Sequence, residues 1–272
     1  MNISIITVAF NSAATIEDTL HSVAGQSHPD VEHIVIDGAS TDNTVAVVRQ
    51  HGKHLARVVS ERDQGIYDAM NKGAALATGD VIGFLNSDDW YADPDVLARV
   101  SDQFDRGADL VYGDLAFVNS DRPFKVRRVW RDRPHAAQDF FQRGWQPAHP
   151  TTFIRNELFH DLGGFNTRWR IAADYAFLAA AMRHPGLRMA HVGRHLVNMR
   201  LGGASTDGVA AIWRANRECA AALSELGIHS PWRTIARKLA SKVPQIVRAR
   251  LGSDAMIREP LWRPWDREKA GP

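Results

Sequence analysis

Short apolar runs and helix-like stretches take turns along residues 1–118. Five runs rich in β-branched and other apolar residues are predicted as strands: 3–10, 31–38, 56–60, 80–86 and 109–118. Helices are predicted between them, at 12–25, 41–50, 66–78 and 93–106. Alternation of this kind, with short connections, is typical of βαβ units. The chain is therefore predicted to have an α/β fold, with a mostly parallel sheet and helices on both faces.

Acidic side chains follow three of the first four predicted strands. Asp37 ends the second strand, Asp63 follows the third, and the pair Asp88-Asp89 follows the fourth. In parallel sheets, ligands bind in the crevice beyond the carboxyl ends of the strands. We therefore expect these carboxylates to lie along one edge of the sheet and to line a binding site.

The segment Asn86-Ser87-Asp88-Asp89 places two acids at the exit of a buried strand. Such a pair is unfavourable unless a positive charge compensates it. Magnesium ions in proteins commonly take one or two carboxylates together with substrate phosphates. The segment therefore indicates a site for a metal-bound diphosphate. A solvated turn is an equally good alternative, because Asp and Ser favour turns and Asp89 can cap the next helix.

Two other strand ends carry residues that suit a nucleotide. Asp37 stands where α/β proteins bind a ribose hydroxyl or the edge of a base. In the segment 61–73, Lys72 can approach a diphosphate. Alternatively, Asp63, Asp68 and Lys72 form a charge network, since Asp68 and Lys72 are four residues apart on a predicted helix.

The sequence lacks the phosphate-binding loops of other nucleotide-binding classes. It contains no G-x-x-x-x-G-K-[ST], and the turn FNSAAT after the first strand is not G-x-G-x-x-G. These absences argue against P-loop enzymes and nicotinamide-dependent dehydrogenases, and the absence of G-x-S-x-G argues against α/β-hydrolases. The single cysteine, Cys219, excludes an intrachain disulfide and a Cys-based zinc site.

The second half alternates less regularly. We predict a hairpin in 116–130, a strand with a short helix and a Gly-Gly turn in 149–165, a helix at 172–184, a strand at 195–203 and a helix at 206–227. No Pro-, Ser- or Gly-rich linker separates the two halves. Residues 1–230 are therefore predicted to form one domain, with a boundary near Ser230.

Residues 231–272 form a basic tail. They carry ten Lys or Arg and four acids, a net charge of +6, whereas residues 1–230 carry a net charge of −4. The tail is amphipathic and contains Trp, which predicts contact with an anionic membrane surface through 231–265. The alternative is a helix that packs on the domain and exposes a basic face. Pro244 is predicted to divide the tail into two helices.

Other partners and compartments follow from what is absent. The basic charge is not accompanied by a nucleic-acid-binding motif, so no nucleic acid is expected. No apolar run reaches the length of about 18–20 residues that spans a bilayer. The N-terminus, MNISIITVAF, is typical of a strand and not of a signal peptide. A cytoplasmic protein is expected, peripheral on the inner face of the cytoplasmic membrane if the tail binds lipid.

Taken together, these segments resemble the inverting glycosyltransferases of family 2. The matching pieces occur in the family's order at 4–11, 35–44, 60–73, 79–90, 149–155, 163–166, 172–178 and 201–206. The similarity is greatest to short bacterial enzymes of exopolysaccharide, colanic-acid and O-antigen assembly, and the tail lies outside it. The resemblance implies a GT-A fold, which is Rossmann-like, with a nucleotide-binding half (1–115) and an acceptor half (116–230).

The resemblance also implies roles for particular residues. Asn86-Ser87-Asp88 occupies the family's D-x-D position, with Asn in place of the first Asp. Asp88 would hold Mn²⁺ or Mg²⁺ against the donor diphosphate, with Asp89 close by. The implied nucleotide-binding residues are Thr7, Ala9, Asn11, Asp37, Asp63, Gly65, Lys72, Asn86 and Ser87.

Asp174 matches the family's catalytic base, which takes a proton from the acceptor hydroxyl. Without the resemblance, Asp174 is also explained as an acid in the first turn of a helix, where the helix dipole favours it. His149 matches a position that faces the metal or the acceptor, or it is a polar residue near the core. The other eleven histidines show no spacing typical of a metal site.

The implied activity is metal-dependent, inverting transfer of a sugar from a nucleotide-diphosphate donor to a hydroxyl of a glycan or lipid-linked acceptor. UDP is the default nucleotide, with GDP and dTDP open. A sugar nucleotidyltransferase is one alternative, although it needs a glycine-rich, basic loop where this chain has FNSAAT. A non-catalytic nucleotide-sugar binding protein of a membrane assembly complex is another.

Overall fold

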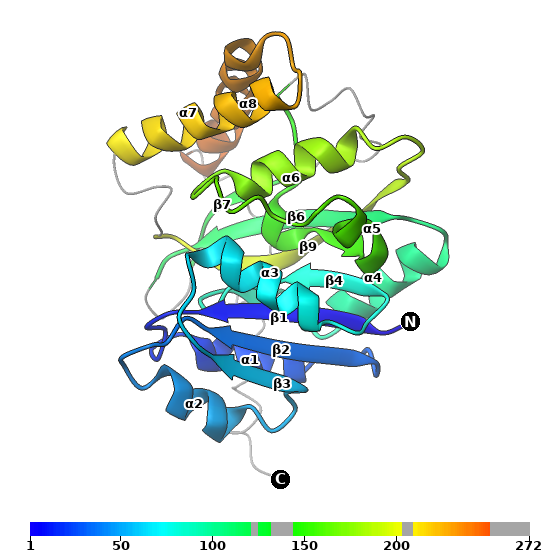
Figure 1. Cartoon of the computed structure of the whole chain (residues 1–272), viewed down its shortest axis with the longest axis vertical. Helices are drawn as coiled ribbons and strands as arrows, with labels where there is room; N and C mark the ends of the chain where they lie inside the picture. The colour runs from blue at the N-terminus through cyan, green and yellow to red at the C-terminus, as the bar shows by residue number, and fades with distance from the viewer. Residues whose placement is uncertain (121–124, 132–143, 203–208, 251–272) are drawn as a thin grey trace.

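The computed structural model describes residues 1–120, 125–131, 144–202 and 209–250, apart from the side chains of 209–211 and 245–250. The strands are β1 (Ile3–Ala9), β2 (Val31–Asp37), β3 (Arg57–Ser60), β4 (Val81–Phe84), β5 (Trp90–Tyr91), β6 (Leu110–Val118), β7 (Val126–Trp130), β8 (Phe153–Arg155) and β9 (Met189–Arg200). In this part of the chain, nine strands form one sheet in the order β3-β2-β1-β4-β8-β6-β9-β5, with β7 paired to β6 (Figure 1).

The first four strands in this order are parallel. β1 pairs with β2 and β4, and β2 pairs with β3. All seven residues of β1 are buried, which is expected of a central strand covered on both faces. The register pairs Ala9 with Asp37 and Asp37 with Ser60, so the carboxyl ends of three strands lie side by side.

The rest of the sheet is mixed. β8 is antiparallel to β4 and β6, β9 is parallel to β6, and β5 and β7 pair antiparallel with β9 and β6. The predicted α/β fold is confirmed. β5 was not predicted, because the two residues Trp90 and Tyr91 are too few to show a strand pattern, and their pairing with β9 alone defines it.

Helices cover both faces of the sheet (Figure 1). Their bounds are α1 (Ile16–Ala24), α2 (Thr44–His51), α3 (Ile66–Leu76), α4 (Val96–Asp105), α5 (Asn156–Asp161), α6 (Ala173–Met182), α7 (Val209–Glu225) and α8 (Pro231–Arg250). α1 and α2 bury Leu20 and Val48 against Ala9 and Val35 on one face. On the other face, α3 and α6 share a core with the neighbouring side chains of β1 and β2.

Gly73 allows α3 to lie close to the sheet. A Cβ atom there would come within 2.4 Å of the Ile6 Cγ2 atom, which is closer than real Cβ contacts allow. Any larger residue would push α3 away from β1. The loop that precedes α3 carries Asp63 and Gly65, so the close approach also fixes this loop at the edge of the sheet.

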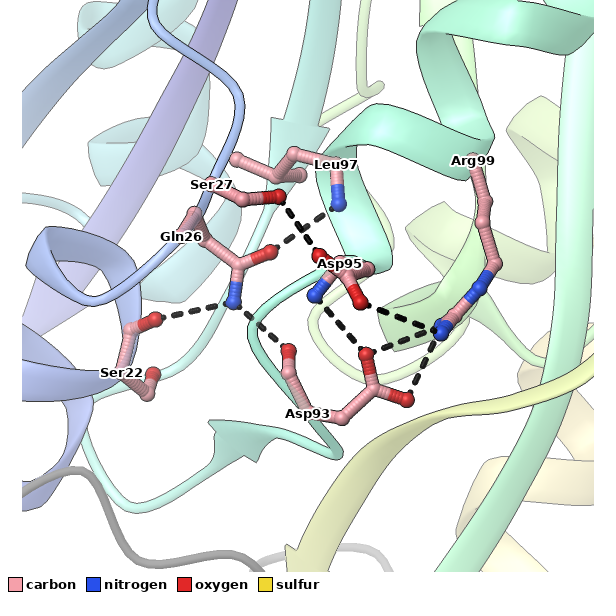
Figure 2. A network of polar contacts seen from close by, with 7 residues as sticks. All are labelled: Ser22, Gln26, Ser27, Asp93, Asp95, Leu97 and Arg99. Atoms are coloured by element: carbon pink, nitrogen blue, oxygen red, sulfur yellow. Dashed lines mark hydrogen bonds and ion pairs between the residues drawn. The ribbon is translucent and has the colours of Figure 1, made fainter.

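A polar network joins the end of α1 to the start of α4 (Figure 2). The Gln26 Nε2 atom donates to the Asp93 carbonyl at 2.9 Å, and its Oε1 atom accepts from the Leu97 backbone N–H at 3.0 Å. Ser27 donates to Asp95 at 2.8 Å, and Arg99 pairs with Asp93 at 2.9 Å. These bonds hold the chain just after the Asp88-Asp89 turn against α1.

The elements predicted in the second half are present. The hairpin is β6 and β7, the strand and short helix are β8 and α5, and both Gly163 and Gly164 have positive φ. The proposed division at 115/116 falls within β6, and β8 of the second half inserts between β4 and β6. The two halves therefore share one sheet.

The tail begins with α8, at the predicted boundary, and packs on α7 and β7. The prediction that Pro244 divides it into two helices is wrong, because α8 continues through Pro244 to Arg250. Pro244 is exposed, so water can satisfy the backbone carbonyl whose partner N–H the proline lacks. Residues 251–265 of the predicted membrane segment lie outside the described residues. Among those described, no helix combines the length and hydropathy needed to cross a bilayer.

Candidate active site

The ends of β1 and β2 are joined by a buried carboxylate. Asp37 accepts hydrogen bonds from the Ser40 backbone N–H at 3.1 Å, the Ser60 hydroxyl at 2.6 Å and the Ser40 hydroxyl. The Ser40 hydroxyl in turn accepts from the Asn11 backbone N–H at 2.8 Å. Asn11 has a φ of 50°, a conformation that Asn adopts more readily than most residues. Asp37 thus holds the strand ends together, and its carboxylate can accept few further hydrogen bonds.

Asp63 lies across the end of β2. A Cβ atom at Gly38 would come within 2.4 Å of the Asp63 Oδ2 atom and 3.5 Å of the Phe10 ring. Asp63 also accepts from the Gly65 backbone N–H at 2.9 Å. The Phe10 side chain is 63% exposed. An exposed aromatic face next to a carboxylate suits a heterocyclic base, which stacks on the ring and donates to the acid. Phe10 was not predicted as a site residue, because one apolar residue at a strand end carries no signal.

Thr7 and Ala9 are buried in β1. The Thr7 hydroxyl lies 3.0 Å from the His33 Nε2 atom, and the Ala9 carbonyl accepts from the Gly38 backbone N–H at 2.8 Å. Their side chains therefore support the floor of the site, while Asn11 lies at its surface.

Lys72 takes part in a charge network. Its Nζ atom lies 2.8 Å from Glu61 and 3.4 Å from Asp68, and it donates to the Arg62 carbonyl at 3.0 Å. The hydrogen bond to Glu61 is the largest cause of a raised pKa at Lys72. The predicted pair of Lys72 with Asp68 is thus present, but Glu61 takes the place predicted for Asp63, whose carboxylate accepts from the Gly65 backbone N–H instead. Lys72 fixes the loop that carries Asp63.

The Asn86–Asp89 turn follows β4 and meets the loop after β1. The Ser87 hydroxyl donates to the Ser12 hydroxyl at 2.8 Å, next to Asn11. In this turn, Asn86 Oδ1 and Asp89 Oδ2 are buried and have no hydrogen-bond partner among the described residues. Asp88 is partly exposed, and burial raises the pKa of its carboxyl. An oxygen-only set with unpartnered buried atoms fits a hard divalent cation.

Asp89 is fully buried behind Asp88. Its Oδ1 atom accepts from the Arg200 backbone N–H at 3.2 Å. Burial and the adjacent Asp88 raise the pKa of Asp89 well above its usual value, and Arg200 opposes that rise. Of the two acids, Asp88 is the one accessible to a ligand. Asp89 can offer a ligand only its Oδ2 atom, because its Oδ1 atom accepts from Arg200.

A buried ion pair supports this turn from behind. The Arg200 guanidinium pairs with Asp18 of α1 and donates to the Asp88 carbonyl. Both side chains are almost fully buried, with 6% of Arg200 and 4% of Asp18 exposed. The Thr19 hydroxyl donates to the Asp89 carbonyl at 2.7 Å. This support was not predicted, because Asp18 and Arg200 are 182 residues apart and neither belongs to a motif.

Asp174 lies in the first turn of α6. Its Oδ1 atom accepts from the Tyr67 hydroxyl at 2.9 Å and from the Tyr175 backbone N–H at 2.7 Å. Burial, followed by the charge of Asp174, raises the pKa of Tyr67, so Tyr67 stays protonated and donates. Tyr67 belongs to α3, so this bond joins Asp174 to the first half of the chain, residues 1–115. Tyr67 lies in the matching segment 60–73, but its contact with Asp174, 107 residues away, was not predicted.

His149 lies between Asp174 and the end of β4. It is in a 3₁₀ turn (His149–Thr151), and its ring stacks on Phe84 with ring centroids 5.7 Å apart. Burial lowers the pKa of His149, and the charge of Asp174 opposes this. Its buried Nε2 atom has no hydrogen-bond partner among the described residues. The imidazole is therefore held neutral, with one polar atom available.

The sequence profile of the family described as "Glycosyl transferase family 2" matches residues 4–168, more than half of the chain. The chain belongs to glycosyltransferase family 2. The match covers the ends of β1 to β4 and His149, and it stops before Asp174 and Arg200. Of the matching segment 201–206, residues 203–206 lie outside the described residues.

Individual relatives agree with this assignment. A "PGL/p-HBAD biosynthesis glycosyltransferase" of Mycobacterium bovis is 36% identical over 196 residues, which cover 70% of this chain and 73% of the relative.

Two solved structures share the fold, which is GT-A-like. S. aureus TarS 1–349 in complex with UDP-GlcNAc has a TM-score of 0.67 at 18% identity, covering 92% of this chain and 79% of that one. The Pyrobaculum calidifontis mannosyltransferase PcManGT, in complex with GDP-Man and Mn²⁺, has a TM-score of 0.61 at 22% identity, covering 99% and 84%.

Proposed function

We propose that this family 2 glycosyltransferase transfers a sugar from a nucleotide-diphosphate donor to a hydroxyl acceptor with inversion at the anomeric carbon. The observation that carries the proposal is the arrangement of two different carboxylates. Asp88 stands at an oxygen-only turn beyond β4 and Asp174 is held by Tyr67 of α3, while the buried His149 stacks on Phe84 of β4 and feels the charge of Asp174. Asp88 is suited to bind a cation, and Asp174 is suited to accept a proton.

The nucleotide is proposed to bind over the ends of β1, β2 and β3. Phe10 would stack on the base. Asp63 or Asp37 would accept hydrogen bonds from an N–H group of the base or from the ribose hydroxyls. Asn11, Gly65, Asn86 and Ser87 would border the ribose and phosphates, with Thr7, Ala9 and Lys72 supporting them. UDP is the default, and the solved relatives bind UDP-GlcNAc and GDP-Man.

A divalent cation, Mn²⁺ or Mg²⁺, would be held by Asp88, with Asn86 Oδ1 and Asp89 Oδ2 as further ligands. When bound, such an ion stabilises negative charge on a departing diphosphate. The chain's own contribution is to present these oxygens without reorganisation, since Arg200 and Thr19 fix the turn. PcManGT was solved with Mn²⁺.

Asp174 is proposed as the base that removes the acceptor hydroxyl proton while that oxygen attacks the anomeric carbon. Attack from the face opposite the nucleotide inverts the configuration and needs no covalent intermediate. Tyr67 orients the carboxylate by donating to Oδ1, which leaves Oδ2 for the acceptor. The neutral His149 imidazole would position the acceptor or a phosphate oxygen.

The acceptor is proposed to be a glycan or a lipid-linked glycan of the cell envelope. The M. bovis relative is named for PGL/p-HBAD biosynthesis. A second relative, of Bacillus subtilis, is named as a putative teichuronic acid biosynthesis enzyme and is 42% identical over 95 residues, 34% of this chain. A cytoplasmic protein that binds the inner face of the membrane would meet such an acceptor.

The outer surface of α7 and α8 supports membrane contact. α8 packs inward through Thr234, Ile235 and two lysines, of which Lys238 lies 4.0 Å from the centre of the Tyr175 ring. Burial lowers the pKa of the second, Lys242, to about 8. The exposed apolar residues of these two helices are Ile212, Trp213, Trp232, Leu239 and Val243.

Basic residues lie next to this apolar surface. A cavity of about 380 Å³ at the turn between α7 and α8 is lined by Arg183, Arg233 and Arg237, among others. Guanidinium groups bind phosphate oxygens in pairs of hydrogen bonds. Exposed Trp together with arginines is the pattern of helices that lie in the interface of anionic bilayers.

Vesicle binding tests this surface. The double variant Trp213→Ala/Trp232→Ala is expected to bind phosphatidylglycerol vesicles at least about 10-fold more weakly than the native chain, because each large apolar side chain contributes about 1.5–3 kcal/mol when buried. Co-sedimentation measures the bound fraction. Val58→Ala, which removes an exposed apolar side chain from β3, is the control and should bind normally. Equal binding of all three proteins, or no binding to anionic vesicles, contradicts the proposal.

A nucleotide panel tests the donor site. UDP at about 100 times its Kd should stabilise the fold by about 2.7 kcal/mol, and more in the presence of Mn²⁺ than without it. Thermal shifts with UDP, GDP and dTDP measure this. Asp88→Asn should abolish the increment due to Mn²⁺, whereas Asp102→Asn, an exposed acid on α4, should not. No shift with any nucleotide would count against the proposed function, and binding without transfer would favour a non-catalytic binding protein.

A further inference from the structure

Three potential metal ligands come together on the surface of α1 and α2, away from the Asp88 turn. Glu17 and His21 are four residues apart on α1, and His51 is the last residue of α2. One ligand atom from each residue lies within 4.8 Å of the other two. The Glu17 Oε1 atom is 3.7 Å from His21 Nε2 and 3.9 Å from His51 Nδ1.

The local packing holds these groups in place. α1 and α2 pack together through Leu20 and Val48, which are both buried. The two imidazole rings meet edge to face, with centroids 5.3 Å apart. The His21 Nε2 atom is buried and has no hydrogen-bond partner among the described residues. A nitrogen in that position is unsatisfied by the protein itself, and a metal ion would satisfy it.

This cluster is separate from the proposed donor site. Thr19, which supports the Asp89 carbonyl, is two residues from both Glu17 and His21. Two residues correspond to about 200° around an α-helix, so the cluster and the Asp89 contact lie on opposite sides of α1. The ligand chemistry also differs, because the Asp88 turn offers only oxygen atoms.

We propose that Glu17, His21 and His51 form a second metal site, which binds Zn²⁺ or a similar borderline metal ion. Two imidazoles and one carboxylate are ligands that such ions prefer, and a water molecule would complete a tetrahedral shell. Tetrahedral zinc with bonds of about 2.0–2.1 Å needs ligand atoms about 3.3 Å apart. The exposed Glu17 side chain and small rotations of the two rings can close the remaining distance. Bound metal would join α1 to α2.

Zinc titration of the untagged full chain tests the site, in excess Mg²⁺ to occupy oxygen-only sites and at about pH 7.5, where an ordinary imidazole is mostly neutral. The native chain should bind one Zn²⁺ in calorimetry. His21→Gln and His51→Gln should each weaken binding at least about 100-fold, since even the loss of an outer-shell partner costs about 10–100-fold. His160→Gln, on the exposed end of α5, should bind zinc as the native chain does.

The spectrum of bound Cu²⁺ gives an independent readout. Electron paramagnetic resonance should show coupling to two nitrogen nuclei, and one nitrogen should be lost in each of the two His variants. Unchanged circular dichroism of the metal-free variants would show that they fold. Absence of zinc binding to the native chain, or the same affinity in both His variants as in the native chain, would overturn the proposal. Neither outcome bears on Asp88 or on the proposed transfer reaction.

Discussion

Asp174→Asn is expected to lower kcat by about 10²–10⁴-fold, the usual contribution of a general base. The amide keeps the size of the side chain and accepts the Tyr67 hydrogen bond through its oxygen, but it cannot take a proton from the acceptor. Donor binding should change little, because Asp174 lies on the acceptor side. Steady-state kinetics with a radiolabelled sugar donor measure kcat, and calorimetry measures the Kd of UDP.

Two further variants separate chemistry from positioning. Tyr67→Phe removes the hydroxyl that orients Asp174 and should lower kcat less than Asp174→Asn does. Asp161→Asn, at the exposed end of α5, should leave both kcat and Kd unchanged. An Asp174→Asn enzyme that retains full kcat would remove Asp174 as the base. A large loss of UDP affinity would instead assign Asp174 to the donor site.

Arg200→Met is expected to reduce the free energy of unfolding by about 3–5 kcal/mol, because it removes the buried guanidinium that pairs with the buried Asp18 carboxylate. Asp18 and Arg200 are 4% and 6% exposed, so water cannot replace the lost interaction. The variant should also bind Mn²⁺ more weakly, since Arg200 fixes the Asp88 carbonyl and the Asp89 carboxylate. Urea unfolding measures the first effect, and the Mn²⁺-dependent thermal shift in the presence of UDP measures the second.

An ion pair with an exposed guanidinium provides the matched control. Arg188 pairs with Asp109 at 2.9 Å, and 64% of its side chain is exposed, so Arg188→Met should leave the urea midpoint nearly unchanged. The double variant Asp18→Leu/Arg200→Met should be more stable than Arg200→Met, because it also removes the buried Asp18 carboxylate. If Arg200→Met were no less stable than the control, the buried pair would not support the turn.

Most of the fold was predictable because strand and helix periodicities are local properties. The central strand β1 is apolar throughout because helices cover both of its faces, and this gives an unbroken run that is easy to recognise. β5 was missed because its two residues become a strand only by pairing with β9, which is 106 residues away in the pair Tyr91–Val197. Pro244 was misjudged because its effect depends on exposure to water.

The candidate site was predictable in part. Asp37, Asp63 and Asp88 were predicted to lie along one edge because each stands at or shortly after the end of a strand, and parallel strands bring their ends to one edge. Phe10 and the Asp18–Arg200 pair were missed, because an apolar residue at a strand end or a charge within a helix or strand is common without any function. The Glu17, His21 and His51 cluster was missed for a related reason, since His51 joins the other two only through the packing of α2 on α1.

The basic tail shows most directly what each level decides. Its sequence determined that a helix forms, that it is amphipathic and that it is basic, because these depend only on residue type and spacing. Which face turns inward was decided by the tertiary structure. Ile235 is buried, and Lys238 and Lys242 pack on the aromatic rings of Tyr175 and Trp130, while Trp232, Leu239 and Val243 face outward. An amphipathic helix buries whichever side its neighbours can complement, and those neighbours are brought to it by segments remote in the chain.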